Sequence, residues 1–236
     1  MSRQILGVFA KAPRPDQVKT RLARATSAEF AAAVALALLR DTLERCAGLP
    51  AERMLVFTPP EACDFFEAEA LQRYRLVPQG DGDLGQRLRQ FITDHLTHVA
   101  DCVVVIGTDS PTLPLGYITR AFELLERHDV VIGPATDGGY YLLGCARCLP
   151  PIFDGIAWGE ATVLGHTVQR LQEASWQMAL LPPWYDVDTL DDWLALAGHI
   201  AALRCAGVDP RLPHTEALLA RGSAADCLRP HHRSAL

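Results

Sequence analysis

Short apolar runs alternate with longer amphipathic stretches along the first two thirds of the chain. The runs that predict strands are residues 4–10, 53–58, 74–78, 102–107 and 129–135. Each is short and dense in Val, Ile, Leu or Phe, as a sheet covered on both faces requires. The alternation of such strands with helices is typical of βαβ units, so the fold class is α/β with a mainly parallel sheet.

The stretches between these strands predict helices. The first covers residues 26–48, where Thr26 and Glu29 have the spacing of a capping box and Gly48 can end the helix. The other helices predicted before residue 136 cover residues 61–71, 84–99 and 115–128. Beyond it the less regular pattern predicts strands over 138–146 and 176–182, and helices over 160–174 and 190–203.

Length and charge narrow the classes of protein. A chain of 236 residues fits one domain with a small appendage, and we assign residues 1–207 to the domain and 208–236 to a C-terminal extension. The formal net charge of -6 argues against a surface that binds nucleic acid. No segment has the roughly 18 uncharged apolar residues that a membrane span needs, and the N-terminus lacks a secretory pattern. We therefore expect a cytoplasmic protein without membrane partners.

The seven cysteines are odd in number and irregularly spaced, which does not predict a disulfide framework. Cys145 and Cys148 form a C-x-x-C pair, but no second pair completes a zinc site. Two interpretations stay open at this point. The favoured one is a set of buried structural thiols, and the other is a redox or metal-binding role for the pair.

The loops that follow the predicted strands are the places to search for chemistry, because ligands of open α/β sheets bind beyond the carboxyl ends of the strands. The segment VFAKAPRPDQVKTRLA places Lys11, Arg14, Lys19 and Arg21 around two prolines. Lysine offers a compact charge and arginine a fork for two phosphate oxygens, so this loop suits a phosphate-rich ligand. A solvated basic loop is the alternative. The segment contains neither a P-loop motif nor a dinucleotide fingerprint.

Acidic residues follow two later segments. Asp109 in VVVIGTDSPTLP comes directly after an apolar strand, where it could cap the next turn or bind Mg²⁺. The segment WYDVDTLDDW carries four acids, and either Asp188 or Thr189 could cap a helix that begins near Leu190. Asp186 and Asp188 lie on the same side of an extended segment, so at least one could reach a metal shared with Asp109.

Two glycine-rich segments complete the set. In GPATDGGYYLLG, Gly138 and Gly139 permit a tight turn with Asp137, Tyr140 and Tyr141 at its rim. This segment is either a β-turn with aromatic packing or a loop that recognises the hydroxyl groups of an acceptor. QGDGDLGQRL leads into a helix and could contact a nucleotide through its backbone.

Taken together, these motifs resemble a known superfamily. A first strand followed by K-x₇-K-T-R-L, then G-T-D-S-P and a late D-V-D-T, resembles the nucleotide-diphosphosugar transferases of the glycosyltransferase-A-type fold. More narrowly, DLGQRL, GTDSPTLP, DGGYYLLG, FDGIAW and DVDT in this order resemble the bacterial radical-SAM/selenodomain-associated transferases. The resemblance spans about Ile5 to Trp193. It implies a three-layer α/β/α sandwich with a mainly parallel, Rossmann-like sheet, a nucleotide site over its first half and an acceptor site over its second.

The resemblance also implies residue roles. Lys19 takes the position of a phosphate-contacting lysine, and Asp109 and Asp188 take those of ligands to Mg²⁺ or Mn²⁺, so these three are the implied catalytic residues. The residues implied at the nucleotide are Lys11, Lys19, Arg21, Asp83, Gly85 and Thr108. Those implied at the acceptor are Asp137, Gly138, Gly139, Tyr140, Tyr141 and Trp158.

The expected activity is a Mg²⁺-dependent transfer of a nucleotidyl group from a nucleoside triphosphate to a phosphorylated small molecule or sugar. Glycosyl transfer from a nucleotide sugar is the alternative, and a non-catalytic nucleotide-binding scaffold is a third interpretation. The expected partners are a nucleotide or nucleotide sugar and a small-molecule acceptor, and a homodimer is a possible assembly.

Overall fold

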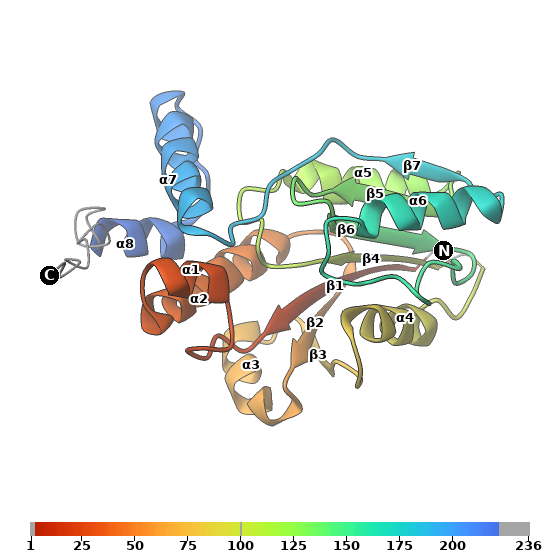
Figure 1. The fold of residues 1–236 in the computed structure, drawn as a ribbon, viewed down its shortest axis with the longest axis horizontal. Helices are drawn as coiled ribbons and strands as arrows, with labels where there is room; N and C mark the ends of the chain where they lie inside the picture. The colour runs from red at the N-terminus through yellow and green to blue at the C-terminus, as the bar shows by residue number, and fades with distance from the viewer. Residues whose placement is uncertain (1–2, 100, 222–236) are drawn as a thin grey trace, which may run out of the picture. The chain divides into compact units, whose positions relative to one another are not determined.

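The computed structural model describes residues 3–99 and 101–221 (Figure 1). Contacts divide the chain into two units, the first formed by residues up to Ala12 and by Thr42–Asp186, the second by Pro13–Asp41 and the chain from Val187 onward. The expected boundary between residues 207 and 208 stays a prediction, and residues 222–236 of the expected extension lie outside the described ranges. Within those ranges, no helix combines the length and apolar character needed to cross a membrane.

The first unit is built on one sheet of seven strands in the order β3-β2-β1-β4-β6-β5-β7 (Figure 1). The strands are β1 (Gln4–Lys11), β2 (Glu52–Thr58), β3 (Arg75–Pro78), β4 (Cys102–Ile106), β5 (Val130–Pro134), β6 (Tyr140–Ala146) and β7 (Met178–Leu180). Every pairing is parallel except those of β6, which runs antiparallel to β4 and β5. The mainly parallel α/β sheet is confirmed, and the reversed direction of β6 is the feature that the sequence pattern did not indicate.

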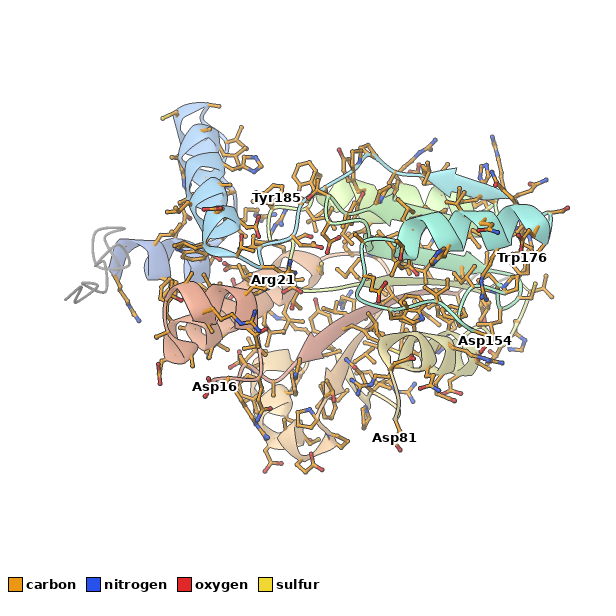
Figure 2. The ribbon with its side chains drawn as sticks, in the orientation of Figure 1. Asp16, Arg21, Asp81, Asp154, Trp176 and Tyr185 are labelled. Atoms are coloured by element: carbon orange, nitrogen blue, oxygen red, sulfur yellow. The ribbon has the colours of Figure 1, made fainter. Side chains whose placement is uncertain are left out.

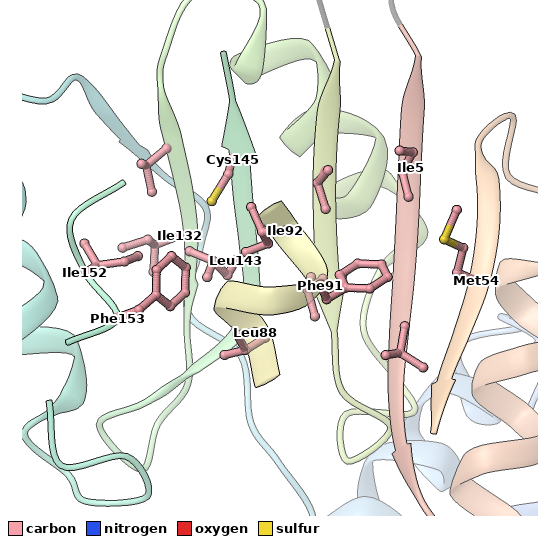
Figure 3. Close-up of a cluster of buried hydrophobic side chains, with 14 of the residues drawn as sticks. Ile5, Met54, Leu88, Phe91, Ile92, Ile132, Leu143, Cys145, Ile152 and Phe153 are labelled. Atoms are coloured by element: carbon pink, nitrogen blue, oxygen red, sulfur yellow. The ribbon is translucent and has the colours of Figure 1, made fainter. Parts of the chain in front are cut away.

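One face of this sheet is covered by α4 (Leu84–His95) and α6 (Val163–Glu173). Leu88, Phe91 and Ile92 of α4 lie over the strands, as Figure 3 shows, because their spacing puts them on one side of the helix. Gly7 of β1 makes room for this contact, since an ideal β-carbon there would lie 2.6 Å from the Phe91 ring.

The other face is covered by α3 (Cys63–Ala70), which follows a short 3-10 turn, η1 (Pro60–Ala62), and by α5 (Leu115–Leu125). The rings of Phe57 in β2 and Phe66 in α3 have centroids 5.0 Å apart. Leu125 of α5 packs 3.1 Å from the position of a β-carbon on Gly144. Helices on both faces make the three layers, α/β/α, that the resemblance implied.

The second unit is helical. It contains α1 (Thr20–Ala25), most of α2 (Ala28–Cys46), α7 (Leu190–Cys205) and α8 (Pro213–Arg221). The buried Asp41 carboxylate of α2 accepts hydrogen bonds from the backbone amides of His214 (3.0 Å) and Thr215 (2.8 Å) at the start of α8. Phe30 of α2 meets Trp193 of α7 edge to face, with ring centroids 5.8 Å apart.

The helix α1 was not predicted, and its presence overturns the predicted capping box. Thr26 donates its hydroxyl to the carbonyl of Leu22 at 2.8 Å and so closes α1. Ser27, one residue later, accepts from the amide of Phe30 at 3.1 Å and begins α2. The Thr26 and Glu29 spacing was therefore the wrong register for the cap.

The C-x-x-C pair is divided between core and surface. Cys145 in β6 has no exposed surface and lies in the apolar cluster under α4, whereas Cys148 is exposed. Neither cysteine is in a disulfide. Burial raises the pKa of the Cys145 thiol above its ordinary value. This geometry favours the interpretation of structural thiols.

Candidate functional site

In the first unit, the carboxyl ends of the parallel strands share one edge of the sheet, and the antiparallel β6 begins at that edge. Three loops at this edge contain six of the predicted site residues, namely Asp83, Thr108, Asp109, Asp137, Gly138 and Gly139. These loops are the loop from β3 to α4, the loop from β4 to α5 and the turn between β5 and β6.

The loop from β3 to α4 is tied to the ends of the first two strands. Gln79 donates its side-chain amide to the carbonyls of Val56 (2.9 Å) and Ala10 (3.3 Å). Arg87, one turn into α4, donates from Nε to the carbonyl of Gly82 at 2.9 Å. Because Gln79 binds the strands from one end of the loop and Arg87 binds the loop from the helix, its glycine-rich backbone is held at the sheet edge.

Asp83 begins α4 as its N-cap. Its carboxylate accepts from the Gln86 amide at 2.9 Å, and the Gln86 side chain accepts from the Asp83 amide at 2.9 Å, a reciprocal capping box. Gly82 precedes it with φ of +94°, a left-handed conformation that favours glycine. Asp83 is therefore positioned as a cap beside the predicted nucleotide loop, and its contact with a nucleotide stays a prediction.

Trp158 lies directly on Gly85 in the first turn of α4. An ideal β-carbon on Gly85 would overlap the indole nitrogen. The indole also meets Tyr140 edge to face at 6.0 Å and stacks on Phe153 at 6.2 Å. The structure thus brings together Gly85, predicted at the nucleotide, with Trp158 and Tyr140, predicted at the acceptor.

The loop from β4 to α5 carries Thr108 and Asp109 and is bound on one side by the segment after β7. Ser110 donates its hydroxyl to Asp186. Thr112 donates to the Tyr185 hydroxyl at 2.9 Å and accepts from the Trp184 indole at 3.2 Å. Figure 2 labels Tyr185 in this segment.

On its other side this loop is held by Arg45, at the end of α2. The guanidinium donates to the carbonyls of Pro111 and Leu113, the latter at 2.8 Å. No local motif indicates this role of Arg45, because its partners lie more than sixty residues away in the sequence. The loop that presents Asp109 is therefore fixed by the tertiary structure around it.

The turn between β5 and β6 has the predicted form. Asp137 accepts from the amide of Gly139 at 3.0 Å, which closes the turn. Gly138 has φ of +93°, and a β-carbon there would overlap the backbone of Ala161. Asp137 is exposed at the rim, so its carboxylate is accessible.

Tyr140 and Tyr141 point to opposite faces of the sheet, because neighbouring residues of a strand alternate. Tyr140 faces α4 and α6, and burial raises the pKa of its hydroxyl. Tyr141 is 4% exposed and donates its hydroxyl to the carbonyl of Pro182 at 2.8 Å. The Tyr141 side chain is thus part of the packed interior, with its hydroxyl bonded. Of the two tyrosines, only Tyr140 lies on the same face of the sheet as Trp158.

The four predicted cations are divided between the units. Lys11, the last residue of β1, belongs to the first unit, and Arg14, Lys19 and Arg21 belong to the second. Lys19 Nζ lies 3.1 Å from Asp188 Oδ1, and Arg21 Nη2 lies 2.5 Å from Asp188 Oδ2 (Figure 2 labels Arg21). Two residues predicted to contact phosphate and one predicted to bind metal therefore form a single ionic cluster, which we call the Asp188 cluster.

Both ends of the Asp188 cluster are fixed by helix starts. Lys19 is the N-cap of α1, with φ of 45°, a conformation uncommon for residues other than glycine. Thr189 is the N-cap of α7 and forms a capping box with Asp192. Asp192 also accepts from the amide of Asp188 at 3.1 Å.

The hydrogen bonds of this cap stabilise the ionised form of the Asp192 carboxylate. Partial burial opposes ionisation of its carboxylate, but the hydrogen bonds from the Thr189 hydroxyl and from two backbone amides outweigh burial. Nearby Arg21 acts in the same direction, and the net effect lowers the pKa of Asp192.

The predicted metal site can be judged on donor chemistry. Carboxylate oxygens are ligands that Mg²⁺ prefers, so Asp109 and Asp188 fit as donors. Each oxygen of Asp188 already contacts a cation, so a metal there would have to share or replace those contacts. Across the described ranges, no group of three or more His, Cys, Asp or Glu side chains is arranged to hold a metal. The metal stays a prediction.

The sheet order and the loops at its edge define a nucleotide-diphospho-sugar transferase type of fold. A structure from Desulfovibrio desulfuricans G20, provisionally named a nucleotide-diphospho-sugar transferase, is 32% identical, with a TM-score of 0.82 over 94% of this chain and 98% of that chain. A cytidylyltransferase from Leptospira borgpetersenii is 16% identical, with a TM-score of 0.59 over 94% and 95%. A CMP-2-keto-3-deoxy-manno-octonic acid synthetase, complexed with CTP, is 11% identical, with a TM-score of 0.54 over 88% and 100%.

The chain belongs to the family described as "Uncharacterized protein conserved in bacteria (DUF2064)", which matches residues 42–160. No curated protein matches the sequence. The comparisons confirm the superfamily that the motifs indicated. The narrower resemblance to the radical-SAM-associated transferases stays a prediction.

Proposed function

We propose that this protein is a Mg²⁺-dependent nucleotidyltransferase that moves a nucleotidyl group from a nucleoside triphosphate to a phosphorylated small molecule or sugar. The observation that carries the proposal is the pairing of Lys19 with Arg21 in the Asp188 cluster, where two positive side chains meet one negative one. A lysine and an arginine held together in this way suit the phosphates of a ligand. The structural likeness to a synthetase complexed with CTP supports a nucleotide as that ligand.

In the proposed reaction, an oxygen of the acceptor phosphate forms a bond to the α-phosphorus while the bond to the bridging oxygen breaks and pyrophosphate leaves. Lys19 and Arg21 would neutralise the charge that grows on the leaving pyrophosphate. Asp109 and Asp188 are the proposed ligands of Mg²⁺, which when bound would supply further charge neutralisation on phosphate oxygens.

The first unit would recognise the nucleotide and the acceptor. The loop from β3 to α4, with Gly85 and the cap Asp83, would contact the nucleotide through its backbone, with Thr108 and Lys11 nearby. Asp137 with its two glycines, Tyr140 and Trp158 would contact the acceptor. Tyr141 would act through packing, because its hydroxyl is bound to Pro182.

The test is release of pyrophosphate from each nucleoside triphosphate with a panel of sugar phosphates and other phosphorylated small molecules. Release should fall by about a hundredfold in Lys19→Met, if the lysine stabilises the leaving group as proposed. Arg24→Met, which removes a cation elsewhere on α1, is the matched control and should stay close to wild type. No release with any pair would reject nucleotidyl transfer.

Glycosyl transfer from a nucleotide sugar is the second candidate, favoured by the name of the 32% identical structure. The same cations would then stabilise a departing nucleoside diphosphate, and Asp137 would be a base or a ligand of a sugar hydroxyl. Hydrolysis or transfer from a nucleotide sugar, without pyrophosphate release from any triphosphate, would establish this candidate in place of the first. Turnover of neither class, with nucleotide binding intact in Asp109→Ala, would indicate a non-catalytic scaffold.

A further inference from the structure

The carboxylate of Asp188 occupies the position between two cations that a phosphate of the ligand would also use. One oxygen contacts Lys19 and the other contacts Arg21, at 3.1 and 2.5 Å. We propose that Asp188 is an internal competitor for this anion site: it holds the two cations in the ligand-free protein and gives them up when a phosphate ligand binds. The proposal rests on the proposed function only in assigning phosphate to the ligand.

The geometry of the contacts supports competition. A carboxylate that offers one oxygen to each cation imitates two oxygens of a phosphate group, since both are anionic acceptors of charge-assisted hydrogen bonds. The Lys19 side chain is only 4% exposed, so its ammonium group has little water to exchange for the carboxylate. A ligand that reaches Lys19 must therefore compete with the Asp188 carboxylate.

The rigidity of the cluster makes this replacement costly. The Asp188 amide is bound to Asp192 at the start of α7, and Thr189 is fixed as the helix cap. Lys19 is fixed in a left-handed conformation at the start of α1. Because both backbones are held, the carboxylate stays close to the cations and repels an incoming anion.

The charges predict the direction of the effect. Lys19 and Arg21 face the Asp188 carboxylate, and the ionised Asp192 lies near Arg21, so the removal of one negative charge should make the cluster attract an anion more strongly. Neutralising Asp188 while keeping its shape would remove the carboxylate charge that faces both cations. Anion affinity should then rise, whereas a merely supportive role for Asp188 predicts that affinity falls because the cations lose their position.

The experiment measures the binding of inorganic pyrophosphate by calorimetry, in EDTA, to the full chain. Asp188→Asn should bind pyrophosphate about tenfold more tightly than wild type, a gain on the scale of a charge contact at a partly buried site. Equal or weaker binding by a folded Asp188→Asn would overturn the proposal. Asp191→Asn is the matched control, because it removes the same charge from an exposed position in the first turn of α7, and it should stay within about twofold.

Two further measurements secure the interpretation. Adding Lys19→Met to Asp188→Asn should abolish the gain, and a gain that persists would show that pyrophosphate binds elsewhere. In wild type, the carbon NMR signal of the Asp188 carboxylate should shift on saturation with pyrophosphate, and an unchanged signal would also overturn the proposal. This second readout does not depend on the variant folding.

The result is separable from the transferase assay. Pyrophosphate is used here as a plain anion, without nucleotide or metal. A protein that releases no pyrophosphate from any triphosphate could still show the gain in Asp188→Asn, and an active transferase could lack it.

Discussion

The indole nitrogen of Trp158 lies in the space where a side chain at Gly85 would begin. This contact favours glycine at position 85. Gly85 lies inside a helix, where alanine would otherwise stabilise the helix more than glycine does. It also joins the start of α4 to the segment before α6.

Gly85→Ala should therefore destabilise the protein, by about 1–3 kcal/mol as overpacking in a well-packed region does. Chemical denaturation measures the change. Gly80→Ala is the matched control, because the nearest atoms to a β-carbon there are at 3.7 and 3.9 Å, ordinary contact distances. Removing the indole with Trp158→Ala should make a second change at position 85 nearly neutral or stabilising. If Gly85→Ala is as harmless as the control, the contact is not close in solution.

Arg45→Met should loosen the loop that presents Asp109. The carbonyls of Pro111 and Leu113 would lose their charged donor, which costs about 1–3 kcal/mol of unfolding free energy. Amide hydrogen exchange over residues 108–114 should accelerate. Arg120→Met, which removes an exposed arginine paired with Glu123, is the control and should change neither quantity appreciably. Unchanged exchange in Arg45→Met would show that the loop is held by its other contacts.

The depressed pKa of Asp192 predicts how its contribution depends on pH. The carboxylate is more acidic in the folded protein than in the unfolded chain, so its stabilisation is fully present above the unfolded pKa, about 4. That stabilisation is lost as pH falls through the folded pKa. Asp192→Asn should therefore lower the unfolding free energy by about 1 kcal/mol at neutral pH, with the gap to wild type closing in acid.

Asp191→Asn is the comparison for this pH series. It neutralises an exposed carboxylate of the same helical turn, and its difference from wild type should be much smaller across the range. A gap for Asp192→Asn that is constant with pH would mean that the capping bonds do not depend on its charge.

The C-x-x-C pair should react unequally with a thiol reagent. Cys148 is exposed, whereas Cys145 has no exposed surface and burial raises its thiol pKa. Peptide mapping after brief labelling of the native protein should find Cys148 modified and Cys145 protected. Cys46, whose pKa burial raises to about 12, is an internal control for protection. Equal labelling of both members of the pair would reopen the redox interpretation.

The apolar runs predicted all seven strands because each is short and dense in apolar residues, although the edge strands β3 and β7 are only partly buried. The direction in which a strand runs is not indicated by its apolar residues. The run at 140–146 looks like any other buried strand, and its antiparallel pairing depends on the tight turn at Gly138 bringing the chain straight back beside β5. Local pattern gives the strand, but only the tertiary structure gives its orientation.

The site was predicted less completely, for reasons that particular residues make clear. Lys19, Arg21 and Asp188 were each identified from their loops, but a pairing across 167–169 residues leaves no local signal. Thr26 and Ser27 are both good caps, and the unexpected α1 decided between them. Tyr140 and Tyr141 were assigned together because they are adjacent, although strand alternation sends one of them into the packing.

The reversed strand β6 has a consequence for how this scaffold can diversify. Since β6 enters the sheet at the edge where its neighbours leave it, residues 135–139 form a short hairpin closed at both ends by the sheet. Such a hairpin can be exchanged as a cassette without altering the length of any crossover helix. Under the proposed function, a change of acceptor would require changes in these five residues together with Tyr140 and Trp158, while the strands before β5 could stay the same.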